Sequence, residues 1–183
     1  MTAGALTFLV GGARSGKSTL AVQVGERSGC PVHFIATAEA FDDDLRDRIN
    51  RHRAERPPSW TTAEVPVELA AAIANAPADA FVIVDCLTVW LANLFIHVPD
   101  PERRAEHGVD VVAALGQRSA RTSPVVVVSN EVGMGIHPDT PMGREYRDEL
   151  GRLNQLVAAA ADTSLLMVAG RAIRLENAWD LLS

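Results

Sequence analysis

The residues with the clearest chemistry lie near the N-terminus, where the octapeptide GGARSGKS matches the motif G-x-x-x-x-G-K-[ST] at every fixed position. In such a loop the glycines let several backbone N–H groups face one phosphate chain, and the N-terminus of the following helix adds partial positive charge. Lys17 is expected to reach the β- and γ-phosphates, and the Ser18 hydroxyl is expected to hold Mg²⁺. The candidate phosphate-binding residues are Gly11, Gly12, Ala13, Arg14, Ser15, Gly16, Lys17 and Ser18.

The flanking sequence favours a phosphate-binding loop over a glycine-rich turn that contains Lys-Ser by chance. The apolar run ALTFLV has the length of a strand and leads directly into the glycines, and a helix-forming stretch begins at Ser18. This order of strand, loop and helix is the one that the motif requires. The chain is therefore predicted to bind a nucleoside triphosphate.

Five apolar runs have the length and composition of strands that are buried on both faces of a sheet. These predicted strands are Leu6–Val10, Val32–Ala36, Phe81–Val84, Val125–Ser129 and Ser164–Ala169. The predicted helices are Ser18–Arg27, Asp42–Arg56, Val67–Ala74, Leu87–Ile96, Val109–Arg121 and Gly143–Ala161, with an exposed loop over Pro99–Gly108. Strands that alternate with helices indicate an α/β fold with a parallel sheet covered by helices.

Length and composition indicate one nucleotide-binding domain that covers residues 1–183. Hydrophobic residues make up 48% of the chain, which excludes disorder, and the net charge of −6 argues against a nucleic-acid-binding protein, which needs a basic face. The phosphate loop begins too early for a signal peptide, and no apolar run approaches the ~20 residues of a membrane span. We expect a cytoplasmic protein, with Cys30 and Cys86 as small buried hydrophobes in a reducing compartment.

Polar residues follow the ends of the predicted strands, where ligands bind in open parallel sheets. Thr37-Ala38-Glu39 follow the second strand, and Asp85 comes directly after the third. Asp85 has the position of the acid that fixes Mg²⁺ in phosphate-loop enzymes. The alternative is that Asp85 is the N-cap of the helix that begins at Leu87.

The stretch DDDLRDRINRHRAER at residues 42–56 is predicted to form a helix, with acidic residues at its start and basic residues at its end. On spacing alone, His52 could be an incidental residue of a solvated, salt-bridged helix. The alternative is that the neighbouring arginines grip phosphate and keep the imidazole neutral, so that it can attack the α-phosphorus of a nucleotide. Among the other histidines, His33 is expected in the core, and His137 is a weaker candidate beside the ligand.

Five sequence blocks occur in an order that is typical of one enzyme family: GGARSGKS, IATAEAFDDDLRDRINRHRAERPPSWTTAEVP, DCLTVWLANL, SNEVGMG and GREYRDELGRLNQLVAAAAD. From Leu6 to about Leu166 the chain resembles the bifunctional adenosylcobinamide kinase/adenosylcobinamide-phosphate guanylyltransferase family of cobalamin biosynthesis. The resemblance implies a RecA-like P-loop NTPase fold, with a mostly parallel sheet, helices on both faces and a homotrimeric assembly. It also implies phosphorylation of the aminopropanol hydroxyl of adenosylcobinamide, followed by transfer of GMP from GTP to adenosylcobinamide phosphate. GTP and ATP are the implied nucleotide substrates, with Mg²⁺ as cofactor.

The resemblance also implies roles for particular residues of this sequence. His52 matches the histidine that is guanylylated, so the implied intermediate is a guanylyl-histidine. The other implied nucleotide-site residues are Ala36, Thr37, Ala38, Arg53, Ala54, Glu55, Arg56, Glu64 and Asp85. Two alternatives stay open: a simple small-molecule kinase of the same fold, in which His52 is structural, and a GTP-binding regulatory module.

Overall fold

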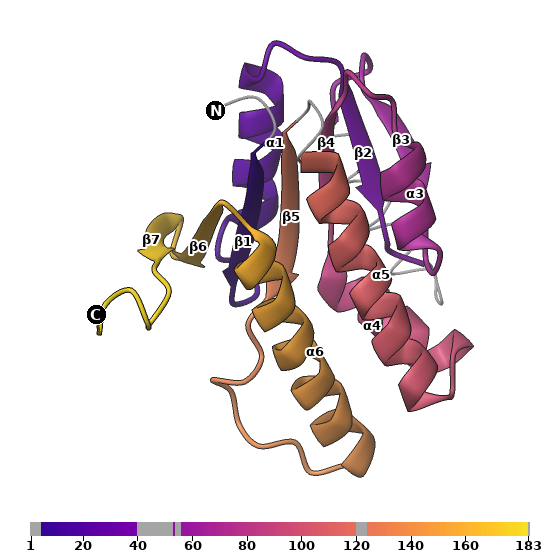
Figure 1. The fold of residues 1–183 in the computed structure, drawn as a ribbon, viewed down its shortest axis with the longest axis vertical. Coiled ribbons are helices and arrows are strands. Elements are labelled where there is room, and N and C mark those ends of the chain that lie inside the picture. The colour runs from indigo at the N-terminus through magenta and orange to yellow at the C-terminus, as the bar shows by residue number, and fades with distance from the viewer. Residues whose placement is uncertain (1–4, 40–52, 54–55, 120–123, 183) are drawn as a thin grey trace.

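The computed structural model describes residues 5–39, 53, 56–119 and 124–182, and strands alternate with helices through most of them (Figure 1). The elements are β1 (Leu6–Gly11), α1 (Lys17–Arg27), β2 (Val32–Ala36), β3 (Thr61–Glu64), α3 (Leu69–Asn75), β4 (Phe81–Asp85), α4 (Leu87–His97), α5 (Pro101–Ser119), β5 (Val125–Asn130), α6 (Pro141–Ala160), β6 (Thr163–Val168) and β7 (Arg171–Leu175). Most of the helix predicted over Asp42–Arg56, including His52, Ala54 and Glu55, lies outside the described residues.

The described strands form one sheet of seven, in the order β3-β2-β4-β5-β1-β6-β7. Neighbouring strands are parallel except for β6 and β7, which are antiparallel. In this register Ala36 lies between Glu64 and Asp85, and Gly11 lies opposite Asn130. Because the carboxyl ends of parallel strands meet at one edge, the phosphate loop, Glu64 and Asp85 leave the sheet on the same side.

The five strands predicted from apolar runs are confirmed, and each observed bound differs from the predicted one by at most one residue. Two further strands, β3 and β7, were not predicted. The sequence of β3 is TTAE and that of β7 is RAIRL, and no residue of either strand is fully buried. Both lie at edges of the sheet, so neither needs the continuous apolar run that marks a strand covered on both faces.

The prediction of an exposed loop over Pro99–Gly108 is wrong, because helix α5 begins at Pro101 and runs to Ser119. Proline is well tolerated at the start of a helix, where its missing N–H needs no partner. The charged residues that suggested a loop include Arg104, which is only 4% exposed. Its guanidinium donates hydrogen bonds to both carboxylate oxygens of Glu149 on α6, at 2.9 and 3.1 Å, and to the carbonyl oxygen of Pro99 at 2.9 Å. A buried ion pair between two helices therefore produced the polar pattern of a surface loop.

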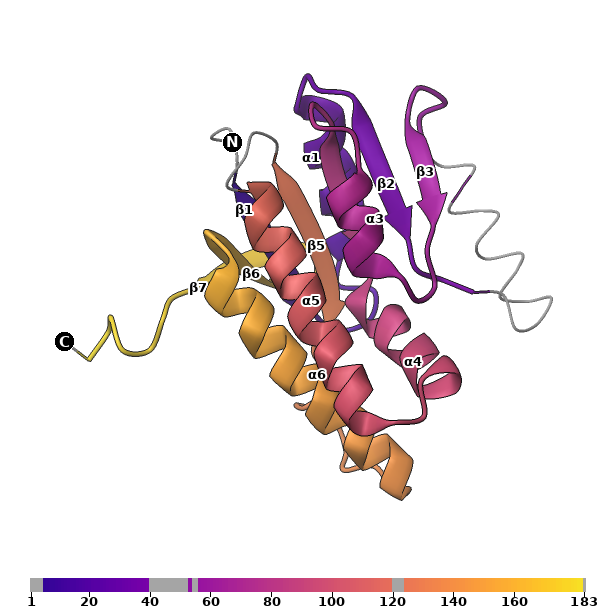
Figure 2. The same cartoon turned by 45° about the vertical axis from the view of Figure 1, so that its right-hand side comes forward.

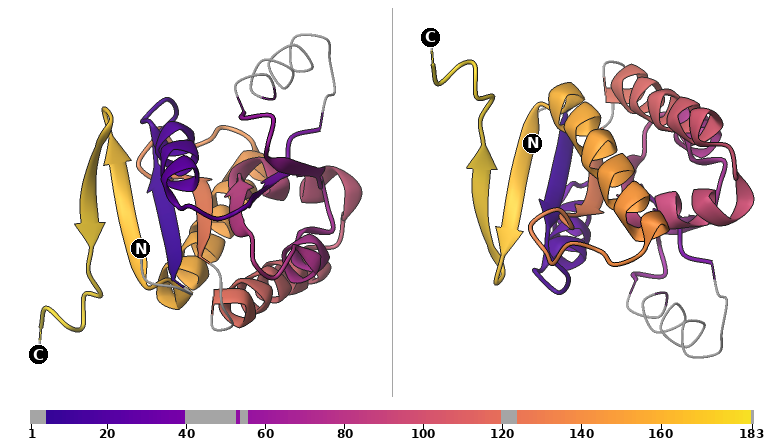
Figure 3. Two further views of the ribbon diagram at one scale, coloured as in Figure 1. Left: turned by 90° about the horizontal axis from the view of Figure 1, so that it is seen from above. Right: turned by 90° about the horizontal axis from the view of Figure 1, so that it is seen from below.

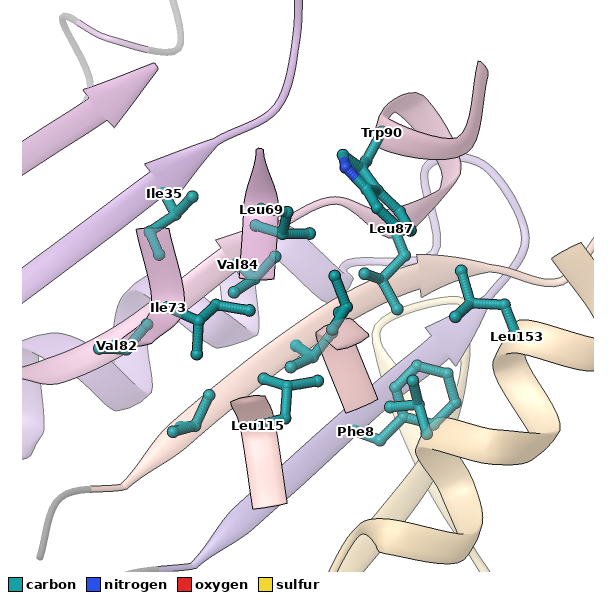
Figure 4. Packing of buried hydrophobic residues seen from close by; sticks show 14 of the residues in the cluster. Phe8, Ile35, Leu69, Ile73, Val82, Val84, Leu87, Trp90, Leu115 and Leu153 are labelled. Atoms are coloured by element: carbon teal, nitrogen blue, oxygen red, sulfur yellow. The ribbon is translucent and has the colours of Figure 1, made fainter. Parts of the chain in front are cut away.

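Helices cover both faces of the sheet, as predicted, but unequally (Figures 2 and 3). On one face, side chains from α3, α4, α5 and α6 pack against the strands in a core that includes Phe8, Val84, Leu87, Trp90 and Leu115 (Figure 4). On the other face α1 packs through Ala21 against apolar residues of β1, β2, β4 and β5. None of the helices that the structure describes has both the length and the apolar character needed to cross a bilayer.

The turn between β6 and β7 contacts the phosphate loop directly. Ala169 and Gly170 both have positive φ angles, 50° and 72°, and the backbone N–H of Gly170 donates a hydrogen bond to the carbonyl oxygen of Ser15 at 2.9 Å. Beyond this turn, β7 and the C-terminal segment expose apolar side chains: Ile173, Leu175, Trp179, Leu181 and Leu182. The hairpin therefore joins the phosphate loop to an apolar surface at the edge of the sheet.

Candidate nucleotide-binding site

The phosphate loop connects the end of β1 to the first turn of α1, the order that its sequence predicts. Gly16 has φ 98°, a left-handed conformation that only glycine adopts without strain. Gly11 is required for a different reason, since a Cβ atom there would overlap the carbonyl oxygen of Met167 on β6. These two glycines therefore let the backbone turn tightly from β1 into α1 while it passes close to β6.

Lys17 is the first residue of α1 and is only 6% exposed. Its ammonium group donates hydrogen bonds to the carbonyl oxygens of Gly11 at 2.9 Å and Gly12 at 2.7 Å, and to the Ser15 hydroxyl at 3.3 Å. Burial lowers the pKa of Lys17 because a charged amine is costly away from water, and the nearby Cys86 and Asp85 act in the opposite direction. The loop thus surrounds the Lys17 ammonium group, which lies beside the backbone N–H groups that would face a phosphate chain.

A second group of charged side chains comes from the segment between β2 and β3 and from the last residue of β3. Arg53 forms an ion pair with Glu64, with Nη2 to Oε1 at 3.1 Å, although both side chains are at least half exposed. Arg56 places its guanidinium carbon 3.8 Å from the ring centroid of Phe34 on β2, a cation–π contact. The structure therefore brings together three of the residues that the family resemblance implied, Arg53, Arg56 and Glu64.

The charge of Arg56 is coupled to the acids at this edge of the sheet. Burial lowers its pKa most strongly, the carboxylates of Asp85 and Glu64 raise it, and Arg53 lowers it. Glu64 and Asp85 flank Ala36 at the ends of β3 and β4, and Arg56 contacts Phe34 on β2, the strand between them. His52, Ala54 and Glu55 precede Arg56 in the chain but lie outside the described residues, so their assignment to the site stays a prediction.

Thr37 follows β2 and is fully buried, while Ala36 is buried and Ala38 half-buried. The Thr37 hydroxyl donates to the carbonyl oxygen of Cys86 at 2.7 Å and accepts from the backbone N–H of Cys86 at 2.9 Å. This reciprocal pair links the end of β2 to the residue after Asp85. The side chain of Thr37 thus fixes the shape of the site edge, and a nucleotide role for Ala36, Thr37 and Ala38 stays a prediction.

Asp85 is the last residue of β4 and is half-buried. The alternative that it is the N-cap residue of α4 is wrong, because the N-cap residue is Cys86, whose side chain makes no capping hydrogen bond. Asp85 and the half-buried Ser18 offer only oxygen ligands, the type that Mg²⁺ prefers. No group of three or more His, Cys, Asp or Glu side chains that could hold a metal occurs in the described part of the chain. The residues present fit a cation held jointly with substrate phosphates, as expected for Mg²⁺ in phosphate-loop enzymes.

His33 and His137, two of the histidines outside residues 42–56, have local hydrogen-bond partners. His33 on β2 is half-buried rather than in the core, and its Nδ1 lies 2.8 Å from the Thr61 hydroxyl. His137, the weaker candidate for a ligand contact, is exposed, with its Nδ1 2.7 Å from the Arg147 guanidinium. The expectation that Cys30 is buried is wrong, since it is exposed, whereas Cys86 is half-buried and burial raises the pKa of its thiol to about 11.

Sequence reasoning missed a network of buried polar side chains beneath the site. The Thr88 hydroxyl accepts a hydrogen bond from the backbone N–H of Asn130 at 2.7 Å, and the amide of Asn154 donates to the Asn130 carbonyl oxygen at 3.0 Å. The Tyr146 hydroxyl donates to the Thr88 carbonyl oxygen at 2.8 Å. These contacts fix the end of β5 beside Gly11. A signal in the sequence was a polar residue on the apolar face of a predicted helix, as for Asn154 beside Leu150, Leu153 and Val157.

The parallel sheet, the loop between β1 and α1, the buried lysine and the acid that ends β4 define the class of phosphate-loop nucleotide-binding proteins. Solved structures that share this fold include the following two. The flagellar accessory protein FlaH from Methanocaldococcus jannaschii has a TM-score of 0.56 at 14% identity, over 95% of this chain and 79% of that one. The RadB recombinase has a TM-score of 0.54 at 20% identity, over 90% of this chain and 74% of that one. RecA-like architecture is thereby confirmed.

Sequence relatives identify the family. Residues 7–175 match the family described as cobinamide kinase / cobinamide phosphate guanyltransferase. The bifunctional adenosylcobalamin biosynthesis protein CobP of Pseudomonas aeruginosa is 42% identical over 164 residues, covering 89% of this chain and 92% of that protein. The bifunctional adenosylcobalamin biosynthesis protein CobU of Salmonella typhimurium is 37% identical over 185 residues, covering 93% and 99%. The chain belongs to the cobinamide kinase/cobinamide phosphate guanyltransferase family.

Proposed function

We propose that this enzyme phosphorylates the aminopropanol hydroxyl of adenosylcobinamide and then transfers GMP from GTP to the resulting phosphate, through a guanylyl-histidine formed on His52. Family membership supports the two activities. The observation that carries the mechanism is that the phosphate loop and the Arg53, Arg56 and Glu64 cluster lie at one edge of the sheet. One nucleotide site can therefore serve both reactions.

In the kinase step the substrate hydroxyl attacks the γ-phosphorus of the bound triphosphate, and the bond to the β-phosphate oxygen breaks. Lys17 and the backbone N–H groups of the loop stabilise the negative charge that develops on the transferred group. Ser18 and Asp85 would hold Mg²⁺, which neutralises phosphate charge when it is bound. The products are adenosylcobinamide phosphate, the nucleoside diphosphate and the proton that the hydroxyl releases.

In the guanylyl step a neutral His52 nitrogen attacks the α-phosphorus of GTP, an N–P bond forms and pyrophosphate leaves. The phosphate of adenosylcobinamide phosphate then attacks the same phosphorus, the N–P bond breaks, and free histidine and adenosyl-GDP-cobinamide result. Arg53 and Arg56 belong to the sequence that follows His52, and guanidinium groups bind phosphate oxygens in a fixed fork geometry. We assign them to holding the guanine nucleotide and its leaving pyrophosphate.

Incubation with α-³²P-GTP and Mg²⁺ distinguishes this proposal from its two alternatives. A covalent label that is lost in acid and kept in base supports a phosphoramidate on histidine. Protein that stays unlabelled, and that forms ADP when ATP and a cobinamide substrate are added together, indicates a simple kinase. Slow release of GDP and phosphate with no covalent label indicates a GTP-binding regulatory module.

His52→Ala should separate the two activities, because the kinase step uses none of the chemistry of an imidazole nucleophile. Phosphorylation of adenosylcobinamide should continue, while formation of the GDP derivative and of the covalent adduct should stop. Intact mass after exposure to GTP measures the adduct in both proteins. An adduct that persists in His52→Ala would place the nucleophile elsewhere, with His137 as the next candidate. Loss of both activities would show that His52 shapes the site for both reactions.

The proposal includes a homotrimer, which the family resemblance implies. The apolar side chains exposed on β7 and the C-terminal segment offer a surface that a neighbouring subunit could cover. Light scattering coupled to size-exclusion chromatography measures the mass directly. A mass of three chains at micromolar concentration supports the trimer, and a mass of one chain excludes it.

A further inference from the structure

A buried asparagine on α4 links the two ends of the segment that leaves the sheet after β2 and returns as β3. Asn93 is 1% exposed, and its side-chain amide donates one hydrogen bond to the carbonyl oxygen of Thr37 at 2.7 Å and another to that of Pro66 at 3.1 Å. Thr37 follows β2 and Pro66 follows β3. Both amide hydrogens are used, so a single side chain sets the distance between these two points of the backbone.

The segment between Thr37 and Pro66 carries most of the residues assigned to guanylyl transfer. It contains His52, Arg53, Arg56 and Glu64 in sequence, and its last strand pairs with β2. One turn before Asn93, the indole N–H of Trp90 donates to the carbonyl oxygen of Val67 at 2.7 Å. Helix α4 therefore donates hydrogen bonds to the successive carbonyl oxygens of Pro66 and Val67 after β3, and to the carbonyl oxygen of Thr37 after β2.

The sequence around Asn93 shows that packing alone does not require a polar residue there. Its neighbours in the helix, Leu91 and Leu94, are buried in the core of the α3–α6 face. Asparagine is a poor helix former, and burying an amide is unfavourable unless its hydrogen bonds are made. Its own Oδ1 has no hydrogen-bond partner among the described residues. The residue thus contributes to the structure through its two donors.

We infer that Asn93 is a positioning residue for guanylyl transfer, which fixes the backbone at Thr37 and at Pro66, the two points between which the chain carries Arg53, Arg56 and Glu64. This inference rests on the proposed function, because it takes His52 and the following arginines as the guanylyl-transfer residues. The phosphate loop lies between β1 and α1, outside the segment that Asn93 spans. Asp85, the other residue assigned to the kinase step, is followed by Cys86, which is hydrogen-bonded to the Thr37 hydroxyl and not to the Thr37 carbonyl oxygen that Asn93 binds. The kinase step should therefore depend on Asn93 less than guanylylation does.

A matched control lies in the same structure. Asn154 on α6 is also buried, at 9% exposure, its amide also donates to a backbone carbonyl at the end of a strand, and its Oδ1 also has no partner among the described residues. Its acceptor is Asn130, which pairs with Gly11 at the start of the phosphate loop. Both reactions use that loop. Asn154→Leu should therefore lower both activities by the same factor, while Asn93→Leu should change their ratio.

The experiment compares Asn93→Leu, Asn154→Leu and the unmodified enzyme. The rate of covalent labelling is measured at saturating α-³²P-GTP without corrinoid. The kinase kcat and the KM for ATP are measured with adenosylcobinamide as substrate. Tm is measured for each protein. For Asn93→Leu we expect labelling to be about tenfold slower, from the loss of two hydrogen bonds, with a kinase kcat within about threefold of the unmodified enzyme. The KM for ATP should be unchanged.

A parallel fall of both activities in Asn93→Leu, or no change in either, would overturn the inference and leave Asn93 a structural residue. Failure of the unmodified enzyme to become labelled would instead refute the guanylyl-histidine itself, before any variant is compared. If Asn93→Leu does not fold, Asn93→Ser keeps one donor in a smaller side chain and should shift the ratio in the same direction. An unchanged ratio in that variant would also overturn the inference.

Discussion

Replacement of Lys17 by methionine tests whether one phosphate loop serves both reactions. Methionine keeps an unbranched side chain of similar length but removes the positive charge and the three hydrogen bonds to Gly11, Gly12 and Ser15. A preorganised donor that faces developing charge contributes about 2.7–4 kcal/mol to a transition state, which corresponds to about a hundredfold to a thousandfold in kcat. Both activities should therefore fall by at least about a hundredfold.

The same substitution should leave the fold intact, which separates a chemical effect from a structural one. Burial lowers the pKa of Lys17, so the charged amine is itself costly to bury, and its removal offsets the loss of hydrogen bonds within the loop. The free energy of unfolding should change by less than about 1 kcal/mol. Urea denaturation measures this quantity, and kcat/KM for each half-reaction measures the loss of activity.

A loss of one activity without the other would refute the shared loop. If Lys17→Met lost kinase activity but kept guanylyl transfer within about tenfold of the unmodified enzyme, the GTP for guanylylation would bind at a separate site. Equal losses in both half-reactions, with an unchanged free energy of unfolding, would support the single site.

Two further predictions concern the end of β4. Asp85→Asn should raise the Mg²⁺ concentration needed for half-maximal turnover by about tenfold to a hundredfold without lowering Tm, and an unchanged Mg²⁺ titration would remove Asp85 from the metal site. The raised pKa of the Cys86 thiol, from 9.0 to about 11, means that the folded protein keeps a proton that the unfolded chain releases. Its contribution to stability is therefore complete below pH 9 and is lost as the pH rises towards 11. The free energy of unfolding should fall less steeply over this range in Cys86→Ala, and equal slopes in the two proteins would contradict the assignment.

The sequence predicted those parts of the fold whose burial is continuous along the chain. The runs that became β1, β2, β4 and β5 are covered on both faces, so their hydrophobicity alone identified them. The run that became β6 was found in the same way, although that strand is only partly buried. The short strand TTAE could not be found in this way, because it lies at an edge and is held by its pairing with β2. The predicted start of helix α5 was too late in the chain. Arg104 pairs with Glu149 on a helix that is distant in sequence, and no local pattern contains such a contact.

The candidate site was partly predictable for a topological reason. Parallel strands bring their carboxyl ends to one edge, so the strand order of the sequence alone predicts that the phosphate loop and Asp85 lie together. The contact of Arg56 with Phe34, and the hydrogen bonds from Asn93 to Thr37 and Pro66, depend on how side chains from separate elements pack. Composition and spacing hold no information on such contacts.

The hydrogen bond between Gly170 and Ser15 gives the edge of the sheet a mechanical connection to the phosphate loop. The turn that makes this bond leads directly into β7, whose five residues are all exposed. A chain that pairs with β7 would restrict the same turn, and so reduce the motion of the loop backbone at Ser15 and Gly16. The entropy that the loop loses when it closes around a triphosphate would then be lost at assembly instead, and nucleotide affinity would depend on how much of the protein is assembled.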